Sequence, residues 1–228
     1  DEAGLGHVGT ARSEAEGAAP QVYELERHGR TTRIAHLAAT YGTNGMPVDA
    51  DKPWSVQLID TEQIVEQATA AREDGADLVL VSIHCCVEYV TEPTDQQVQI
   101  GQELADSGVV DLVIGHHAHV PQPVARLEGG PHGDGMWIAY GLGNFLSNQD
   151  GACCSSRTDS GLWLTAHVRH PDDGPARVSE VEWTAVTVDR RGGHRTHALA
   201  EIADGGGSLS AEEVAARHGR VLEAAGDE

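Results

Sequence analysis

Residues 109–120 read Val-Val-Asp-Leu-Val-Ile-Gly-His-His-Ala-His-Val, an apolar run that ends in a glycine and three histidines. The mostly β-branched residues 109–114 predict a buried parallel strand, interrupted only by Asp111. We expect Gly115 to let the backbone turn tightly where this strand ends. This one stretch therefore predicts an α/β fold built around a parallel sheet.

The three histidines, His116, His117 and His119, are expected in the loop that follows this strand. In open α/β sheets, ligands collect outside the carboxyl ends of the strands. Imidazoles that are two residues apart in a loop can converge on one cation. The pattern therefore predicts a metal site, and the alternative is a solvated histidine-rich turn.

A second strand in the sequence leads to another histidine, His84. The predicted elements are, in order, a helix over 60–74, a strand over 77–83, a helix over 94–107 and the strand over 109–114. Two parallel strands joined by a right-handed crossover end at the same edge of a sheet. We therefore expect His84 to lie close to His117 and His119.

The rest of the chain predicts mainly β structure. The expected elements are a hairpin over 20–39, a loop over 40–55, a strand over 137–140, a glycine-rich turn over 141–145, a polar loop over 148–160, an antiparallel pair over 161–170 and 177–188, and a helix over 210–225. Residues 205–207 are all glycine and predict a flexible linker. We expect one domain over residues 1–200, followed by the linker and C-terminal helix over 201–228.

The charge of the chain limits its partners. Its 36 acidic and 15 basic residues give a formal net charge of −21, and Lys52 is the single lysine. Such a surface repels nucleic acid and anionic lipid, so we expect neither as a partner. No run of 18 apolar residues predicts a membrane span. The chain begins at Asp1 without a methionine, in what resembles the last turn of a helix, so we expect that an N-terminal portion is missing.

The four cysteines form two adjacent pairs, Cys85-Cys86 and Cys153-Cys154. One disulfide between the pairs would enclose about 70 residues and would indicate an oxidising compartment. The alternative is four free thiols. A structural zinc site is disfavoured because adjacent cysteines lack the two-residue gap that such sites use.

A two-metal hydrolytic site also needs carboxylates, one of which bridges the cations. Asp77 and Asp111 lie at strand starts, on the wrong edge of the sheet for this role. Glu88 follows His84 on the expected edge and is a candidate proton donor or substrate contact, or else a surface glutamate. Asn144 could aim its amide into the same pocket, or else simply form the turn.

Several motifs, taken in order and spacing, resemble the CapA family of bacterial capsule and poly-γ-glutamate synthesis proteins. The matching segments are Ser-Ile-His at 82–84, Val-Glu-Tyr at 87–89, Pro93, Gln97, residues 111–120, Gln-Pro at 122–123, and Tyr-Gly-Leu-Gly-Asn-Phe at 140–145. The resemblance covers about residues 5–170 and corresponds to the second half of the family's domain. It implies a partial αββα sandwich of the calcineurin-like metallophosphatase type, with helices outside and mixed sheets inside.

The resemblance also implies a site. His84, His117 and His119 fall on metal-ligand positions, while His116 falls on a more variable one. Glu88 matches the glutamate of the family's His-Trp-Gly-x-Glu-Tyr pattern. Cys85-Cys86 replaces the Trp-Gly of that pattern, which suggests a pairing with Cys153 or Cys154.

The Asp-x-His, Gly-Asp and Gly-Asn-His-type segments of the family's first half are not found before His84. By the resemblance, the chain lacks the bridging aspartate and about half of the ligands. We therefore expect weak metal binding, or none, at a complete two-metal site.

By the same resemblance, the expected function of the full-length protein is capsule or poly-γ-glutamate synthesis through a metal-dependent hydrolase of the phosphoesterase or amide-hydrolase type. It would use Mn, Zn or Fe ions and act on a phosphoester or an anionic polymer. The alternative is a non-catalytic surface component that binds or exports an anionic polymer. We expect an extracellular or cell-surface location, with a signal peptide or anchor lost with the N-terminus, and association with a polymer synthesis complex.

Overall fold

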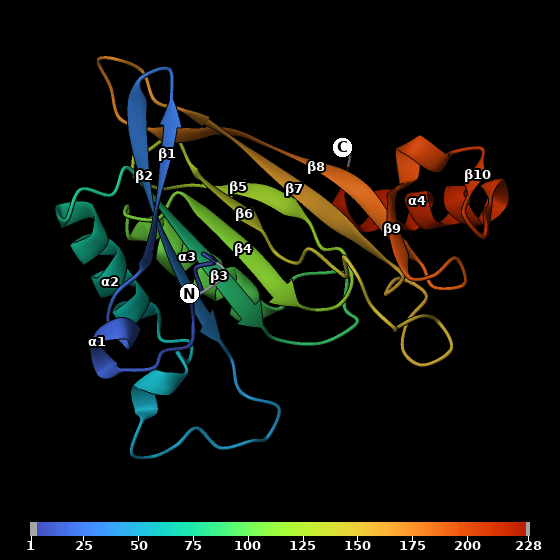
Figure 1. The fold of residues 1–228 in the computed structure, drawn as a ribbon, viewed down its shortest axis with the longest axis horizontal. Helices are drawn as coiled ribbons and strands as arrows, with labels where there is room; N and C mark the ends of the chain where they lie inside the picture. The colour runs from blue at the N-terminus through green and yellow to red at the C-terminus, as the bar shows by residue number, and fades with distance from the viewer. Residues whose placement is uncertain (1–3, 227–228) are drawn as a thin grey trace.

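The structure, a computed structural model, describes residues 4–226. Its larger sheet has six strands in the order β1-β2-β3-β4-β6-β5 (Figure 1). The bounds are β1 Gln21–Arg27, β2 Arg30–Thr40, β3 Leu78–Cys85, β4 Leu112–His117, β5 Val124–Leu127 and β6 Met136–Ala139. Strands β2, β3, β4 and β6 are parallel, and the outer strands β1 and β5 are antiparallel to their neighbours. The predicted hairpin and parallel strands are confirmed.

Two helices cover one face of this sheet. Helix α2 spans Thr61–Glu73 and helix α3 spans Asp95–Asp106. The side chain of Asp60 caps α2, and Thr94 forms a full capping box with Gln97 at the start of α3, as the sequence predicts. Their apolar faces pack on the strands in a core built from Ile64, Ala68, Ile100, Leu104, Val79, Val81, Val113 and Ile138. A short helix α1 (Glu14–Gly17) and a 3-10 turn (Pro53–Ser55) precede α2.

The second sheet contains three antiparallel strands, β7 Ser160–Arg169, β8 Arg177–Asp189 and β9 Arg195–Ala198. Alternate residues of β8 point to one face. On that face Val181 packs against the larger sheet, whereas Trp183 and Ala185 pack against helix α4 (Ala211–Ala225). The predicted α/β sandwich is therefore confirmed, with α2 and α3 outside the larger sheet and α4 on the inner face of the second sheet, beside β5 (Figure 1).

The predicted glycine linker has a defined structure. Gly205 and Gly206 form β10, which pairs with β11 (Leu209–Ser210), and a 3-10 turn (Leu199–Ile202) precedes it. The backbone N–H of Ser208 donates to the buried carboxylate of Asp189, which anchors the hairpin to β8. A buried acceptor outside the segment therefore orders residues that composition alone describes as flexible. The domain boundary at residue 200 stays a prediction.

The histidine strand differs from its prediction at both ends. It begins at Leu112 because the Asp111 carboxylate accepts a hydrogen bond from the backbone N–H of Val79 and pairs with Arg72. It continues through His117, so Gly115 lies within the strand and not at a turn. The absence of a side chain at Gly115 instead allows a close approach of the Tyr140 carbonyl.

Gly115→Ala tests this close approach. A Cβ at this position would overlap the carbonyl oxygen of Tyr140 and lie 2.8 Å from that of Ala139, so β4 and the chain after β6 must separate. We expect a loss of about 3 kcal/mol in the free energy of unfolding, measured by urea titration. Gly219→Ala in α4 is the control, because nothing lies within 4 Å of its Cβ, and it should stabilise the helix slightly. Equal stability of the two variants would refute the packing role.

The residues at the N-terminal end, Asp1 to Ala3, where the sequence suggested a helix end, lie outside the described residues. None of the helices within residues 4–226 is both long and apolar enough to cross a bilayer.

Candidate metal centre

The ends of β3 and β4 bring His84 and His117 together. The strands are parallel neighbours, with His84 opposite His116 and Cys85 opposite His117. In a regular strand, His117 would face away from His116 and His84. Its positive φ of 85° breaks this alternation, and the Nδ1 atom of His117 lies 3.1 Å from the Nε2 atom of His84. A local backbone conformation therefore assembles the pair, and His117 belongs to the strand and not to the expected loop.

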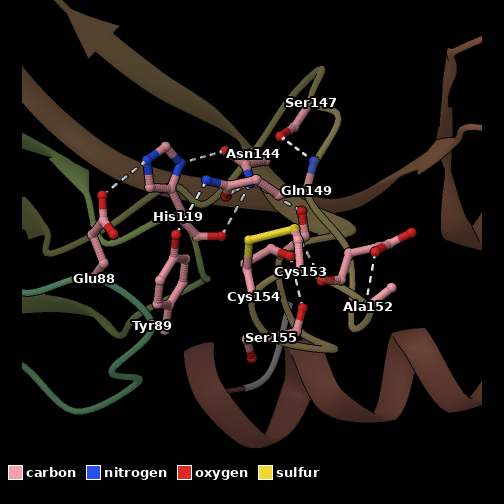
Figure 2. The surroundings of a disulfide bond; sticks show 12 residues. Glu88, Tyr89, His119, Asn144, Ser147, Gln149, Ala152, Cys153, Cys154 and Ser155 are labelled. Carbon is pink, nitrogen blue, oxygen red and sulfur yellow. Dashed lines mark hydrogen bonds and ion pairs between the residues drawn. A yellow bond between two sulfur atoms is a disulfide. The ribbon is translucent and has the colours of Figure 1, made fainter.

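His119 lies beside this pair and is held by Asn144. The ring centroids of His117 and His119 are 6.2 Å apart. The Nδ1 atom of His119 lies 2.9 Å from Oδ1 of Asn144 (Figure 2). The Asn144 amide nitrogen donates to the carbonyl oxygens of His119 and Thr158 and to the side chain of Gln149, which assigns Oδ1 as the acceptor. His119 therefore donates from Nδ1 and keeps the lone pair of Nε2 available.

Asn144→Ala removes the group that orients His119. Because outer hydrogen-bond partners of metal ligands set ring orientation, we expect the affinity of the chain for Zn²⁺ to fall by about 10- to 100-fold. Isothermal titration calorimetry measures this change. Asn148→Ala is the control, since Asn148 lies four residues further along the same segment, is exposed and contacts His194 instead. Unchanged affinity in the Asn144 variant would show that the contact does not support a ligand.

The loop after β3 supplies Glu88 and Tyr89. A carboxylate oxygen of Glu88 lies 3.8 Å from the Nε2 atom of His119. The backbone N–H of Tyr89 donates to the carbonyl oxygen of Ala118, which ties this loop to the histidine segment. Figure 2 shows Glu88 on one side of His119 and Asn144 on the other. The structure thus brings Glu88 and Asn144 to the histidines, and their catalytic roles stay predictions.

Two further residues lie near the histidines, and the sequence patterns did not predict either of them. The ring of Tyr41 lies 4.6 Å from that of His117, centroid to centroid, and stacks on His84 at 6.3 Å. Tyr41 directly follows β2, whose end is level with that of β3, so recognition of a third parallel strand would have found it. The side chain of Gln149 donates to the Tyr89 hydroxyl and accepts from Asn144, a link between distant loops that no local pattern indicates.

The surroundings favour neutral imidazoles. Burial lowers the pKa of His84, and the nearby His117 and His119 rings lower it further, against the opposing effect of Glu88. Burial is also the main cause of the lowered pKa of His117. A neutral imidazole has the free lone pair that binds a metal ion. His116 is more buried, and burial lowers its pKa as well.

The donor set fits part of a metal site. Two nitrogen ligands about 2.1 Å from one cation lie about 3.0 to 3.4 Å apart, and the His84–His117 separation of 3.1 Å agrees with this. Within residues 4–226, however, no group of three or more histidine, cysteine, aspartate or glutamate side chains is arranged to hold an ion. The two imidazoles therefore fit as ligands to one cation, with His119 as a third donor nearby. Metal binding by these residues stays a prediction.

The expected disulfide between the cysteine pairs is wrong, and so is the alternative of free thiols. Cys85 is bonded to Cys86, and Cys153 is bonded to Cys154. Cys85 and Cys86 pack into the core under α2 and α3. Cys153 and Cys154 lie in a turn, where the backbone N–H groups of both donate to the Asp150 carbonyl, and Figure 2 shows their disulfide. Each cysteine is therefore bonded to its neighbour in sequence, and no disulfide joins the two pairs.

A comparison with known families identifies the first two thirds of the chain. The family model described as bacterial capsule synthesis protein PGA_cap matches residues 1–149, a segment that contains all the candidate site residues. The PGA biosynthesis protein CapA of Bacillus subtilis (strain 168) is 29% identical over 123 residues, which are 54% of this chain and 29% of that protein. The capsule biosynthesis protein CapA of Bacillus anthracis is 31% identical over 153 residues, or 65% of this chain and 34% of that protein.

The chain thus spans about a third of the length of these curated relatives. Among solved structures, the calcineurin-like phosphoesterase YfkN from Bacillus subtilis aligns with 90% of this chain and 58% of its own, at 15% identity and a TM-score of 0.42. The family match extends over well more than half of the chain and includes the histidine strand and the glycine-rich turn. The chain belongs to the family of bacterial capsule synthesis proteins that includes CapA.

Proposed function

We propose that this chain forms the histidine side of a divalent-metal centre, in a protein that hydrolyses a phosphoester or an amide during synthesis of an anionic capsule polymer. The observation that supports the proposal is the convergence of His84 and His117, whose ring nitrogens are 3.1 Å apart at the carboxyl ends of two parallel strands. Imidazoles with a nearby carboxylate are donors that suit Mn, Zn or Fe ions.

The residues take separate roles in this proposal. His84 and His117 would hold the cation, which when bound would polarise the scissile group and acidify a water molecule. His119 would present its Nε2 atom, because Asn144 holds its Nδ1 atom. Glu88, 3.8 Å from that Nε2 atom and partly exposed, would transfer a proton to a leaving group. The polymer or phosphoester would reach the histidines from the exposed side of the strand ends.

Cleavage of bis(p-nitrophenyl) phosphate tests hydrolysis directly. We expect added Mn²⁺ or Zn²⁺ to stimulate cleavage by the full-length protein that contains this chain and by its His167→Ala control, whose ring lies on the exposed face of β7 and pairs with Glu182. His84→Ala should reduce the rate to background. Equal, background-level rates for all three proteins with either metal would refute the hydrolase role for this chain.

One observation favours a second function, non-catalytic binding of the polymer. The described residues lack a third metal-binding side chain in place around His84 and His117, and no carboxylate lies between them. A two-nitrogen site can bridge a cation to a polyanion without supplying a nucleophile. In this function the protein would act at the cell surface or outside the cell, in contact with the polymer synthesis complex. Metal-dependent polymer binding without cleavage distinguishes it from hydrolysis.

A further inference from the structure

A cleft of about 480 Å³ lies far from the histidines, between β5 and the β7–β8 hairpin. Three arginines from three strands line it, and they are Arg126, Arg169 and Arg177. The cleft also contains two carboxylates, those of Asp134 and Glu180. Its arginines outnumber its carboxylates, in a chain whose overall charge is −21.

The arginines of the cleft are incompletely neutralised. One carboxylate oxygen of Asp134 lies 3.2 Å from a guanidinium nitrogen of Arg126 and 3.8 Å from one of Arg177. The guanidinium of Arg169 makes no ion pair or side-chain hydrogen bond with any residue in the part of the chain that the structure describes. A single carboxylate thus serves two guanidinium groups, and the third has none.

Two of these arginines face each other across a strand pair, where their positive charges repel unless an anion lies between them. Arg169 and Arg177 are directly opposite each other in the antiparallel pair of β7 and β8. Like charges at such positions destabilise a sheet, because their side chains leave it about 5 Å apart. An anion bound between them would convert this repulsion into attraction. Arg126 stacks over the ring of Trp137, 5.4 Å from the ring centroid, so its guanidinium is already oriented toward the cleft.

We propose that this cleft binds carboxylate groups of a polyanionic polymer. Asp134 shows that the guanidinium groups of Arg126 and Arg177 can share a carboxylate. The open donors of Arg169 and Arg177 match the planar geometry of a further carboxylate. The cleft would be a second binding site for the anionic polymer, separate from the histidines. The identity of the polymer rests on the proposed function.

The cleft and the histidines lie at opposite ends of one strand. The first residue of β7, Ser160, accepts a hydrogen bond from the backbone of Asn144, beside His119, and the strand ends at Arg169 in the cleft. Nine residue steps of a strand span about 30 Å. A long polymer could therefore contact both sites at once, whereas a short oligomer would occupy the cleft alone.

Fluorescence anisotropy with labelled poly-γ-glutamate at low salt tests the proposal. We expect the double variant Arg169→Gln/Arg177→Gln to bind about tenfold more weakly than the wild type, from the loss of charged hydrogen bonds. Its thermal stability should be equal or higher, because the opposed charges are gone. The control Lys52→Gln/Arg195→Gln removes two positive charges from exposed positions elsewhere and should bind as the wild type does.

Three results would overturn the proposal. The first is that the wild type does not bind poly-γ-glutamate. The second is that the double variant and the control lose the same amount of affinity. The third is that polyphosphate binds as tightly as poly-γ-glutamate and depends on the same arginines. If phosphodiester cleavage fails while the arginine-dependent binding persists, the hydrolase proposal is refuted and the cleft proposal stands.

Discussion

Replacing His117 with alanine should weaken the binding of Zn²⁺ or Mn²⁺ to this chain by about 100-fold or more. Outer hydrogen-bond partners of metal ligands account for about 10- to 100-fold in affinity, and a ligand should account for at least as much. His84 would lose its nearest nitrogen partner, because its Nε2 atom lies 3.1 Å from Nδ1 of His117. Isothermal titration calorimetry of the wild type and the variant measures the change.

The matched control for this change is His167→Ala. His167 is also a histidine near the surface, but it lies in β7 and pairs with Glu182 at 3.0 Å. Its loss should leave the metal affinity unchanged. If the two variants bind metal equally well, the cation is held elsewhere and the proposed centre at the ends of β3 and β4 is wrong.

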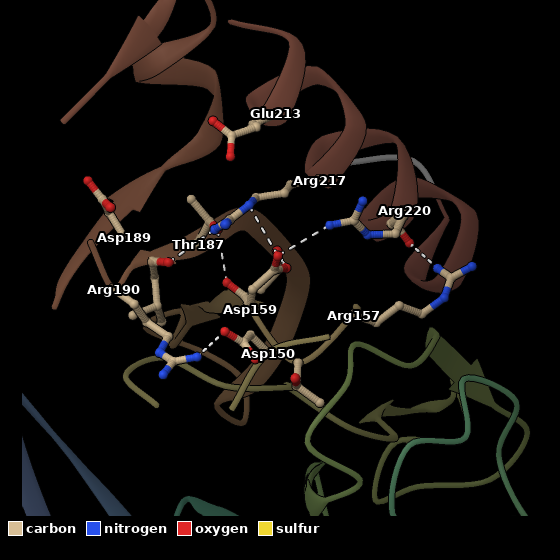
Figure 3. Close-up of polar contacts among 12 residues, drawn as sticks. Asp150, Arg157, Asp159, Thr187, Asp189, Arg190, Glu213, Arg217 and Arg220 are labelled. Atoms are coloured by element: carbon tan, nitrogen blue, oxygen red, sulfur yellow. Dashed lines mark hydrogen bonds and ion pairs between the residues drawn. The ribbon is translucent and has the colours of Figure 1, made fainter. Parts of the chain in front are cut away.

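Asp159→Ala should lower the free energy of unfolding by about 3 to 5 kcal/mol, the largest stability effect we expect. Asp159 is buried and lies beneath α4, where one carboxylate oxygen is 3.1 Å from Nε of Arg217 and 3.3 Å from a terminal nitrogen of Arg220 (Figure 3). The other oxygen accepts a hydrogen bond from Ser160. Removal of the carboxylate would leave two guanidinium groups without their anion at the interface between α4 and the second sheet.

Urea unfolding followed by circular dichroism measures this loss. Glu223→Ala is the control, because Glu223 also ties α4 to the rest of the chain, through Arg157, but is largely exposed. Surface pairs of this kind contribute about 1 kcal/mol or less. A loss of similar size in both variants would show that Asp159 does not anchor α4.

Much of the fold could be predicted from local patterns. Short-range hydrogen bonds specify two helices, whose capping boxes begin at Thr94 and Ser210. Apolar runs that end before His84 and His116 specify two buried parallel strands. Parallel pairing then requires the strand ends to meet at one edge. The order of elements therefore predicts that His84 and His117 lie at the same edge of the sheet, and parallel pairing of β3 with β4 confirms this.

Other features were decided only in the folded chain. The Asp111 carboxylate bonds to the backbone of Val79 at the start of β4, and Asp189 orders the glycine segment. The positive φ of His117 turns its ring toward His84. Residues that follow separate strands, Tyr41 and Gln149, complete the surroundings of the histidines. Each cysteine pairs with its neighbour in sequence, a choice among possible pairings that the spacing of the cysteines did not settle. Periodicity reports which face of an element is buried, but it carries no information about which distant group supplies the partner, and only the packed chain determines that.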